Sequence, residues 1–501
     1  MSDLVPLLVA VPILAAVLTL GVGHLVRRAA WPLAALAAVV QVGLAASVAA
    51  TVYASGEAIS YELGGFEPPY GIELVVDGLS AAVVVLVAVV ALGVLVYARR
   101  AGPRSPAFLT EYLLLVAGLS GMSVTGDMFN LYVFLEITGL AAYALVATGD
   151  SGRAAVGALK YLVIGTVGAS LFLLGVGYAF LATGTLNMAD LSVRLAEVGY
   201  DATLVRASFA LVVVGLAVKT ALYPLHTWQP EAYASAPDSV SAFIAALVST
   251  VSAYALARCV FSIYTVDFLA QVPLARTGLL TLAGVSIVAG SVLAVLQTEI
   301  KRMLAYSSVS QFGLVVAGFT LADPASVTGA TIHLLGHAVM KGGLFLAAGA
   351  IAVIAGARTV DEYDGLGARA PVLSGSFAVL ALAMVGVPPA VGFVGKWYIA
   401  LGAVQSEAWP IAVVILVSTL LTLAYFARLL ERMFFRAAPA TERVTAPGAA
   451  VADGGYTRPD SVSPGMVAVV VLAAALALVL GPATSQFEQL LRPTLETLLQ
   501  L

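Results

Sequence analysis

The chain contains 501 residues, of which 61% are hydrophobic and only 10% charged, and its formal net charge is −4. Soluble domains carry about 25% charged residues, so this composition excludes a soluble globular protein and predicts an integral membrane protein. The small net charge indicates no nucleic-acid or polyanionic partner. The single cysteine, Cys259, excludes an intramolecular disulfide and any cluster held by cysteines.

At about 20 apolar residues per span, the apolar stretches predict an all-α protein with about 14 transmembrane helices. We place these helices at 4–23, 30–52, 76–98, 108–126, 129–148, 157–183, 205–225, 238–264, 277–297, 304–321, 328–356, 372–404, 409–430 and 466–482. The twelfth of them is interrupted by Pro388-Pro389. The stretch after Pro482 has the spacing of a short amphipathic helix.

Lysines and arginines are concentrated in every second loop, and in membrane proteins such loops face the cytoplasm. The loop at 53–74, of the opposite parity, holds Glu57, Glu62 and Glu67 and no basic residue. We therefore expect a multi-pass protein of the cell (plasma) membrane with both termini outside. The N-terminus has no basic region before its first apolar stretch, so we expect that stretch to be a retained helix.

Two of the expected spans combine a helix breaker with a lysine. In the seventh span Lys219 precedes Pro224, and in the twelfth Lys396 follows Pro388-Pro389. Paired broken helices at matching places in two halves predict inverted repeats around a central path. The expected organisation is N-terminal helices at 1–107, two inverted five-helix repeats at 108–264 and 277–430, a cytoplasmic linker at 437–464, and a last helix with its tail at 466–501.

Charged residues at membrane depth are costly and mark ion or proton paths. Glu136 lies about seven residues into the fifth expected helix, and Lys219 lies about two-thirds of the way through the seventh. A carboxylate and an amine can remain ionised together in lipid, and an approaching cation then favours release of the lysine proton. We expect these two residues to pair as a switch. The alternative is a static ion pair that fixes helix packing.

The eleventh expected helix carries His333, His337 and Lys341 at four-residue spacing, which places all three on one helix face. Histidine titrates near neutrality, so this row is typical of a proton relay. A zinc site is the competing reading, but neither an HExxH pattern nor a third ligand is present in the sequence. His333 could instead have only a packing role.

Other charged residues have simpler interpretations. Lys396 would complete the relay in the second half. His226 and Glu231 flank the inner end of the seventh span, where they either admit protons or only solvate a loop. Lys301 and Arg302 lie at the cytoplasmic mouth of the tenth span, and for Arg302 we prefer a topological anchor.

Five segments of the chain, in order, are GDMFNLYVFLEI, VKTALYPLHTWQPEAYASAPDSVSAF, EIKRMLAYSSVSQ, HLLGHAVMKGGLFLAAGA and GVPPAVGFVGKW. Together they resemble the antiporter-like subunits shared by respiratory complex I, Mrp-type multisubunit sodium/proton antiporters and membrane-bound hydrogenases, and they look most like the D-type subunit of the Mrp antiporters. The resemblance implies proton-path roles for five residues, namely Glu136, Lys219, His337, Lys341 and Lys396. The family usually has a lysine in the eighth helix, and that position corresponds to Thr250 here.

From the residues and the resemblance, we expect a proton-conducting subunit that moves H+ in exchange for Na+ inside a hetero-oligomeric membrane complex. The alternative is a proton-pumping membrane subunit of a complex I-like NADH:quinone oxidoreductase or a membrane-bound hydrogenase. The sequence holds no nucleotide, flavin or iron–sulfur motif, so we predict no cofactor, no metal and no enzyme activity on this chain. A self-standing solute transporter and a quinone-site subunit remain open.

Overall fold

The computed structural model describes residues 2–437 and 461–500, and nearly all of the expected linker at 437–464 lies outside them. The described residues form long helices and one two-stranded sheet. The first helices are α1 (Leu7–Leu25), α2 (Arg27–Ser55), α3 (Gly78–Ala101), α4 (Pro106–Val124), α5 (Met128–Ala147), α6 (Gly152–Thr183), α7 (Met188–Val198), α8 (Thr203–Thr220) and α9 (Gln229–Ser235). The eighth expected span, 238–264, consists of α10 (Asp238–Phe243), a π-helical turn (Ile244–Val248), α11 (Ser249–Arg258) and a second π-helical turn (Cys259–Tyr264), and α12 (Thr265–Gln271) follows it.

The second half continues the same helical pattern. Its helices are α13 (Pro273–Val295), α14 (Ile300–Leu321), α15 (Pro324–Ala355), α16 (Leu366–Arg369), α17 (Pro371–Val385), α18 (Val391–Gln405), α19 (Trp409–Phe435), α20 (Pro464–Val479) and α21 (Thr484–Leu499). The only sheet in the described residues is a hairpin of β1 (Ile59–Glu62) and β2 (Glu73–Val76). The prediction of an all-α membrane protein is therefore confirmed.

Twelve helices of the described residues are long and apolar enough to cross a membrane, and thirteen if α20 and α21 are one span bent by 75°. The expected twelfth span, 372–404, is divided into α17 and α18 on either side of Pro388-Pro389. The break in the seventh span also occurs, since α8 ends at Thr220 and α9 begins at Gln229. Both broken helices are as predicted, whereas the count of fourteen stays a prediction.

Several helix starts are fixed by short polar side chains, which satisfy backbone N–H groups that have no partner within the helix. The Asp77 carboxylate accepts hydrogen bonds from the N–H groups of Leu79 and Ser80 at the start of α3. Asp127 and Ser151 cap α5 and α6 in the same way. These caps fix the residue at which each helix begins.

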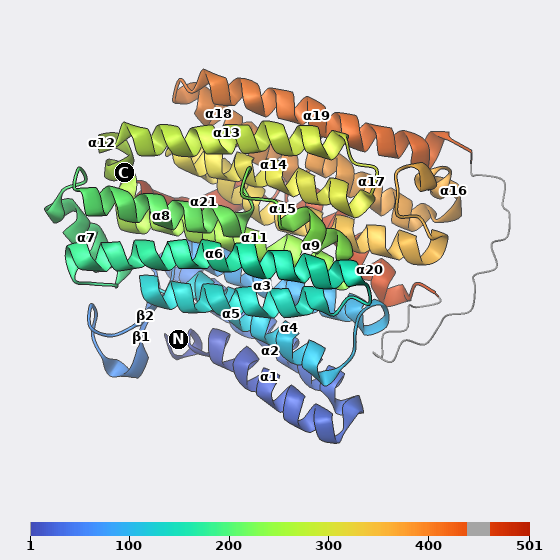
Figure 1. Cartoon of the computed structure of the whole chain (residues 1–501), viewed down its shortest axis with the longest axis horizontal. Helices are drawn as coiled ribbons and strands as arrows, with labels where there is room; N and C mark the ends of the chain where they lie inside the picture. Colours follow the sequence, from blue (N-terminus) through green and yellow to red (C-terminus); the bar gives the residue numbers. More distant parts are fainter. Residues whose placement is uncertain (1, 438–460, 501) are drawn as a thin grey trace.

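The helices lie side by side along the long axis of the molecule, and both termini lie at the same end (Figure 1). α6 packs on α8, the half-helix before the break in its span, and α15 packs on α18, the half-helix after the break in its span. The expected inverted repeats remain a prediction. The segments at the centre are the most enclosed. All of the apolar stretch within residues 238–271 is buried, whereas only 39% of the corresponding apolar stretch of α6 is buried. Lipid-facing helices therefore surround a core that carries the polar residues.

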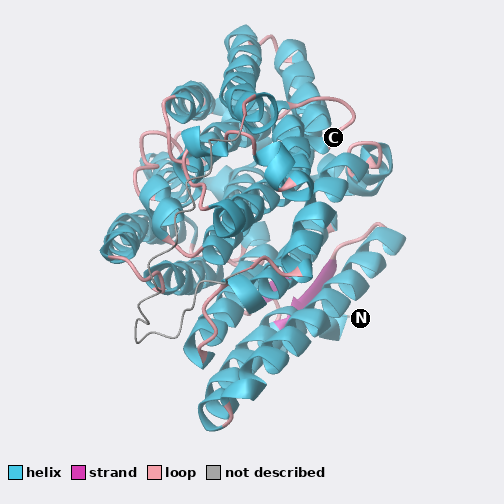
Figure 2. Ribbon diagram, turned by 90° about the vertical axis from the view of Figure 1, so that its right-hand side faces the viewer, coloured by secondary structure: helices cyan, strands magenta, loops and turns pink. Residues whose placement is uncertain are grey.

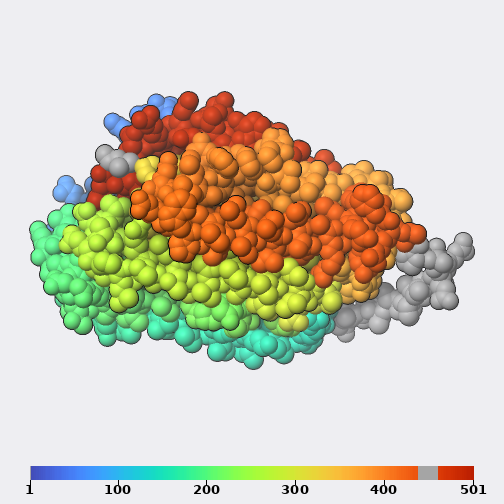
Figure 3. Space-filling view, turned by 90° about the horizontal axis from the view of Figure 1, so that it is seen from above, coloured from blue at the N-terminus to red at the C-terminus, as the bar shows by residue number. Residues whose placement is uncertain are grey.

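Peripheral elements complete the fold. The strands of the hairpin lie beside the N-terminal helices (Figure 2). On another face, α19 lies beside α13 (Figure 3). The expected C-terminal amphipathic helix is α21, whose Leu491, Leu495 and Leu498 are buried in the bundle. The N–H of Gly78 donates to the Thr494 hydroxyl at 3.0 Å, which joins this helix to the start of α3.

Candidate functional site

Lys219 and Glu136 form the predicted pair. The Lys219 Nζ lies 3.6 Å from Glu136 Oε1, with 4% of the lysine side chain and 25% of the glutamate side chain exposed. The expected position of Lys219 within its span is wrong, because α8 ends one residue later at Thr220 and Ala221 takes a left-handed conformation with φ 64°. The lysine therefore occupies the C-terminal end of a half-helix, where unpaired carbonyls favour a cation.

Tyr143 is a member of this site that the sequence analysis missed. Its hydroxyl accepts a hydrogen bond of 3.0 Å from Lys219 Nζ. Two glycines make the room: a Cβ added at Gly139 would lie 3.0 Å from Lys219 Nζ, and one at Gly165 would lie 2.0 Å from the Tyr143 hydroxyl. Tyr143 follows Glu136 by seven residues, which is two helical turns on the same face, so helical periodicity could have identified it.

Aromatic rings support the Tyr143 hydroxyl from one side. Tyr143 meets Tyr161 edge to face at 4.5 Å, and Tyr161 stacks on Trp228 at 3.9 Å. Trp228 donates its indole N–H to the carbonyl of Val218 at 2.9 Å, and this carbonyl lies near the break after α8. Such partners are needed because an unpaired carbonyl at membrane depth is costly.

A polar cluster lies between this pair and the second half. The amide of Gln229 donates to the hydroxyls of Tyr233 (3.1 Å) and Ser249 (3.3 Å). Thr250 is fully buried, and its hydroxyl has no hydrogen-bond partner in the described parts of the chain. It follows the π-helical turn Ile244–Val248, and turns of this kind are frequent at functional sites. An unpartnered buried hydroxyl normally requires water, so the cluster is suited to hydration.

The three residues of α15 are all fully buried. His333 Nε2 lies 2.8 Å from Gln311 Oε1 on α14. Neither ring nitrogen of His337 has a hydrogen-bond partner within the described ranges, and the ring meets Phe312 edge to face at 4.6 Å. Lys341 Nζ donates to the Leu304 carbonyl at 2.9 Å and to the Ser307 hydroxyl.

Lys396 donates hydrogen bonds to backbone carbonyls at the break of the twelfth span. Its Nζ donates to the carbonyls of Met384 (2.9 Å) and Val385 (3.1 Å), the last two residues of α17. The neighbouring Gly395 packs directly on His333, since a Cβ there would lie 2.7 Å from the His333 Cβ. Lys396 and His333 are thus brought together by close packing of α18 on α15.

At the end of the bundle opposite the termini, ion pairs connect the two halves. Lys301 is buried, donates to the Ala236 carbonyl at 2.7 Å and pairs with Asp238 at 3.0 Å. Arg302 pairs with Glu231 at 2.8 Å. Lys301 and Arg302 both therefore contribute to contacts between α14 and the segment around α9, and neither acts only as a surface anchor. The His226 ring lies against Tyr223 and Tyr306, close to this cluster.

The structure therefore groups the predicted residues in two places. Glu136 and Lys219 are paired, and Lys341, His333 and Lys396 gather around α15. Among the described residues, no hydrogen bond or ion pair joins the first group directly to the second, but α11, which carries Thr250, packs against both α8 and α15. The described residues also contain no group of three or more His, Cys, Asp or Glu side chains that could hold a metal ion. The chemistry available is proton transfer among amines, carboxylate, imidazoles and water.

Comparisons with known proteins agree with this architecture. A protein from Desulforudis audaxviator named NADH-quinone oxidoreductase subunit N is 44% identical over 406 residues, which cover 79% of this chain and 80% of that protein. The D subunit of the Na(+)/H(+) antiporter of Bacillus subtilis is 33% identical over 376 residues, covering 74% and 75%.

Solved structures agree as well. A chain of the membrane-bound sulfane sulfur reductase, an archaeal respiratory membrane complex, superimposes with a TM-score of 0.89 at 31% identity, covering 99% of this chain and 97% of that one. A chain of the Mrp complex from Dietzia sp. DQ12-45-1b gives 0.89 at 25% identity, with the same coverage. Residues 125–422 match the family described as NADH:quinone oxidoreductase/Mrp antiporter, TM. This chain therefore belongs to that family and is an antiporter-like, multi-pass membrane subunit of Mrp or complex I-like assemblies.

Proposed function

We propose that this chain is the proton-conducting subunit of a multisubunit cation/proton antiporter, which moves H+ in exchange for Na+. The observation that carries the proposal is the position of Lys219. This buried amine is held between a carboxylate at 3.6 Å and a tyrosine hydroxyl at 3.0 Å, at the end of a broken helix. Ionisable residues buried at membrane depth are retained chiefly for ion transfer.

In the proposed mechanism, Glu136 and Tyr143 stabilise the ammonium form of Lys219. When a second cation enters, or when Glu136 moves away, the charged form loses this support and the proton leaves. Water held by the polar groups around Thr250 then accepts the proton. From there it passes toward His337, Lys341 and Lys396, and His333 orients the row through Gln311.

A second candidate function has its own support. The identity of 44% to a protein named NADH-quinone oxidoreductase subunit N favours a proton-pumping membrane subunit of a complex I-like oxidoreductase. The similarity to the sulfane sulfur reductase complex supports a redox-driven assembly in the same way. In either case the residues of this chain transfer protons, and any electron transfer takes place on partner subunits.

Partners and location follow from the same proposal. The relatives are subunits of larger membrane complexes, so we propose that this chain works inside a hetero-oligomer in the plasma membrane. Both termini lie at one end of the molecule, and we place that end outside the cell. The division into N-terminal helices, two repeats, linker and C-terminal helix remains part of the proposal. His226, at the opposite end, would admit protons from the cytoplasm.

The test is proton transport by the complete complex in membrane vesicles, followed with a pH-sensitive dye. Lys219→Ala and Glu136→Ala should each abolish transport, whereas the matched control Lys160→Ala, at an exposed lysine of α6, should not. Parent-level transport in both site variants would refute the mechanism. Driving the vesicles with a Na+ gradient and, separately, with a reduced electron donor distinguishes the antiporter from the redox-driven pump.

A further inference from the structure

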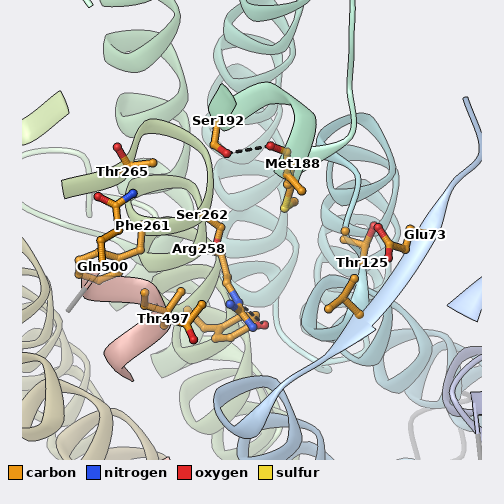
Figure 4. Close-up of a pocket in the computed structure, with 15 residues that line it drawn as sticks. Glu73, Thr125, Met188, Ser192, Arg258, Phe261, Ser262, Thr265, Thr497 and Gln500 are labelled. Carbon is orange, nitrogen blue, oxygen red and sulfur yellow. Dashed lines mark hydrogen bonds between the residues drawn. The ribbon is translucent and has the colours of Figure 1, made fainter. Parts of the chain in front are cut away.

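A pocket of about 300 Å³ (Figure 4) opens near Gln500, close to the C-terminus, at the end of the molecule where both termini lie (Figure 1). We name it the outer pocket and define it by its lining residues: Glu73, Val75, Thr125, Gly126, Met188, Ala189, Ser192, Tyr254, Arg258, Phe261, Ser262, Thr265, Thr497, Leu498 and Gln500. Its volume is about ten times the ~30 Å³ that one water molecule occupies in the liquid. The walls come from β2, α7, α11 and α21, so distant parts of the chain create it together.

The inner end of the outer pocket lies in line with the polar centre of the protein. Thr250, Tyr254 and Arg258 follow one another at four-residue spacing on α11, so they share one helix face and span roughly 12 Å along its axis. Tyr254 and Arg258 line the pocket, and Thr250 is the buried residue whose hydroxyl has no partner in the described segments. This face of α11 therefore runs from the buried Thr250 to the outer pocket, which opens at the surface of the protein.

Arg258 and Tyr254 close this inner end through well-defined contacts. Arg258 Nη2 lies 2.5 Å from the Asp77 carboxylate, and its Nε donates to the Tyr254 hydroxyl at 2.9 Å. That hydroxyl in turn donates to the Ser123 carbonyl at 2.9 Å. The contacts hold α11, α3 and α4 together in the floor of the pocket. They also neutralise the guanidinium, so the carboxylate of Glu73 on the wall favours a cation in the pocket.

We propose that the outer pocket is the outlet by which protons leave the path that begins at Lys219, with Tyr254 and Arg258 as its inner barrier. This inference rests on the proposed function of Lys219. The proton released by the lysine ammonium passes to water beside Thr250 and then to water in the pocket, and it leaves as hydrated H+. The outlet thus branches from the proposed central path beside Thr250: most of the protons leave through the pocket, and the remainder continue toward His337, Lys341 and Lys396.

A cysteine experiment tests the outlet in the complete complex. In a Cys259→Ser background, which removes the only cysteine of the chain, Ser192→Cys places a thiol in the pocket. Ala196→Cys is the matched control, since it is exposed one turn further along α7 and does not line the pocket. A charged, bulky methanethiosulfonate reagent is added on both sides of the vesicle membrane, and labelling and proton transport are measured.

We expect both cysteines to be labelled, and transport to fall at least about five-fold in Ser192→Cys alone. Unchanged transport after full labelling of Ser192→Cys would overturn the outlet, and so would failure of that residue to react. The same vesicles with Lys219→Ala separate the two proposals. If Lys219→Ala abolishes transport but labelling of Ser192→Cys leaves transport unchanged, the outlet is refuted and the proposed function remains in place.

Discussion

Removing the hydroxyl of Tyr143 should slow proton transfer through Lys219. In Tyr143→Phe the lysine loses its 3.0 Å hydrogen bond and keeps only the more distant Glu136 carboxylate. A hydrogen bond to a charged group contributes about 1.5–3 kcal/mol, and each ~1.4 kcal/mol is a factor of ten. We therefore expect the rate of proton transport to fall by about ten-fold or more, while the ring still packs on Tyr161.

Gly165→Ala should reach the same hydroxyl from the opposite side. The added Cβ would lie 2.0 Å from the Tyr143 hydroxyl, whereas real contacts of this kind stay beyond 3.0 Å, so the hydroxyl must move by about 1 Å. The hydrogen bond to Lys219 has only about 0.5 Å of slack before it exceeds 3.5 Å. Gly165→Ala should therefore lower transport about as much as Tyr143→Phe.

The two changes form a double-mutant cycle, measured as proton transport by the complete complex in vesicles with equal amounts of each variant. If both act through the hydroxyl, the double variant should be close to Tyr143→Phe alone, since neighbouring changes that share one interaction do not add. Fully additive losses, or a parent-like Tyr143→Phe, would refute this reasoning.

Three further predictions concern single contacts. Lys396→Met should lower the melting temperature of the complex in detergent. Two buried carbonyls at the end of α17 lose their hydrogen-bond donor, and each unsatisfied carbonyl costs about 1–3 kcal/mol of stability. An unchanged melting temperature would contradict this prediction. Burial alone would raise the pKa of Asp77, but the Arg258 charge and nearby donors hold it below the usual 3.8. The ion pair therefore stabilises the fold above pH 3.8, and this stabilisation is lost as the pH falls. Asp77→Asn should reduce the free energy of unfolding by about 3–5 kcal/mol at pH 7 and by progressively less below pH 3.8. Melting scans at pH 7 and at a pH below 3.8 measure this difference, and an equal loss at the two pH values would contradict the prediction. Gly395→Ala should reduce folded yield because its Cβ meets α15 at 2.7 Å, whereas Gly375→Ala, with no atom within 4 Å, should behave like the parent in the same expression assay.

The predictions made from sequence succeeded where hydrophobic length or helix breakers decide the structure. The apolar stretches gave the helices, and the prolines near Lys219 and Lys396 gave both breaks. The pairing of Glu136 with Lys219 was also predictable, because two opposite charges at membrane depth have few other ways to be satisfied. The expected end of the helix that carries Lys219, at residue 225, was wrong, since helix ends depend on backbone conformation, as the left-handed Ala221 shows.

Tertiary packing decided what lies around these residues. Tyr143 reaches Lys219 only because Gly165, on another helix, leaves space for its hydroxyl. Lys396 donates to α17 because the chain turns back between two half-helices. The outer pocket needs walls from residues 73 to 500, which are far apart in sequence. The sequence by itself thus determined that buried charges exist and that long apolar helices surround them. Which atoms meet was decided by the close approach of helices, because steric fit between distant segments leaves no periodic signal along the chain.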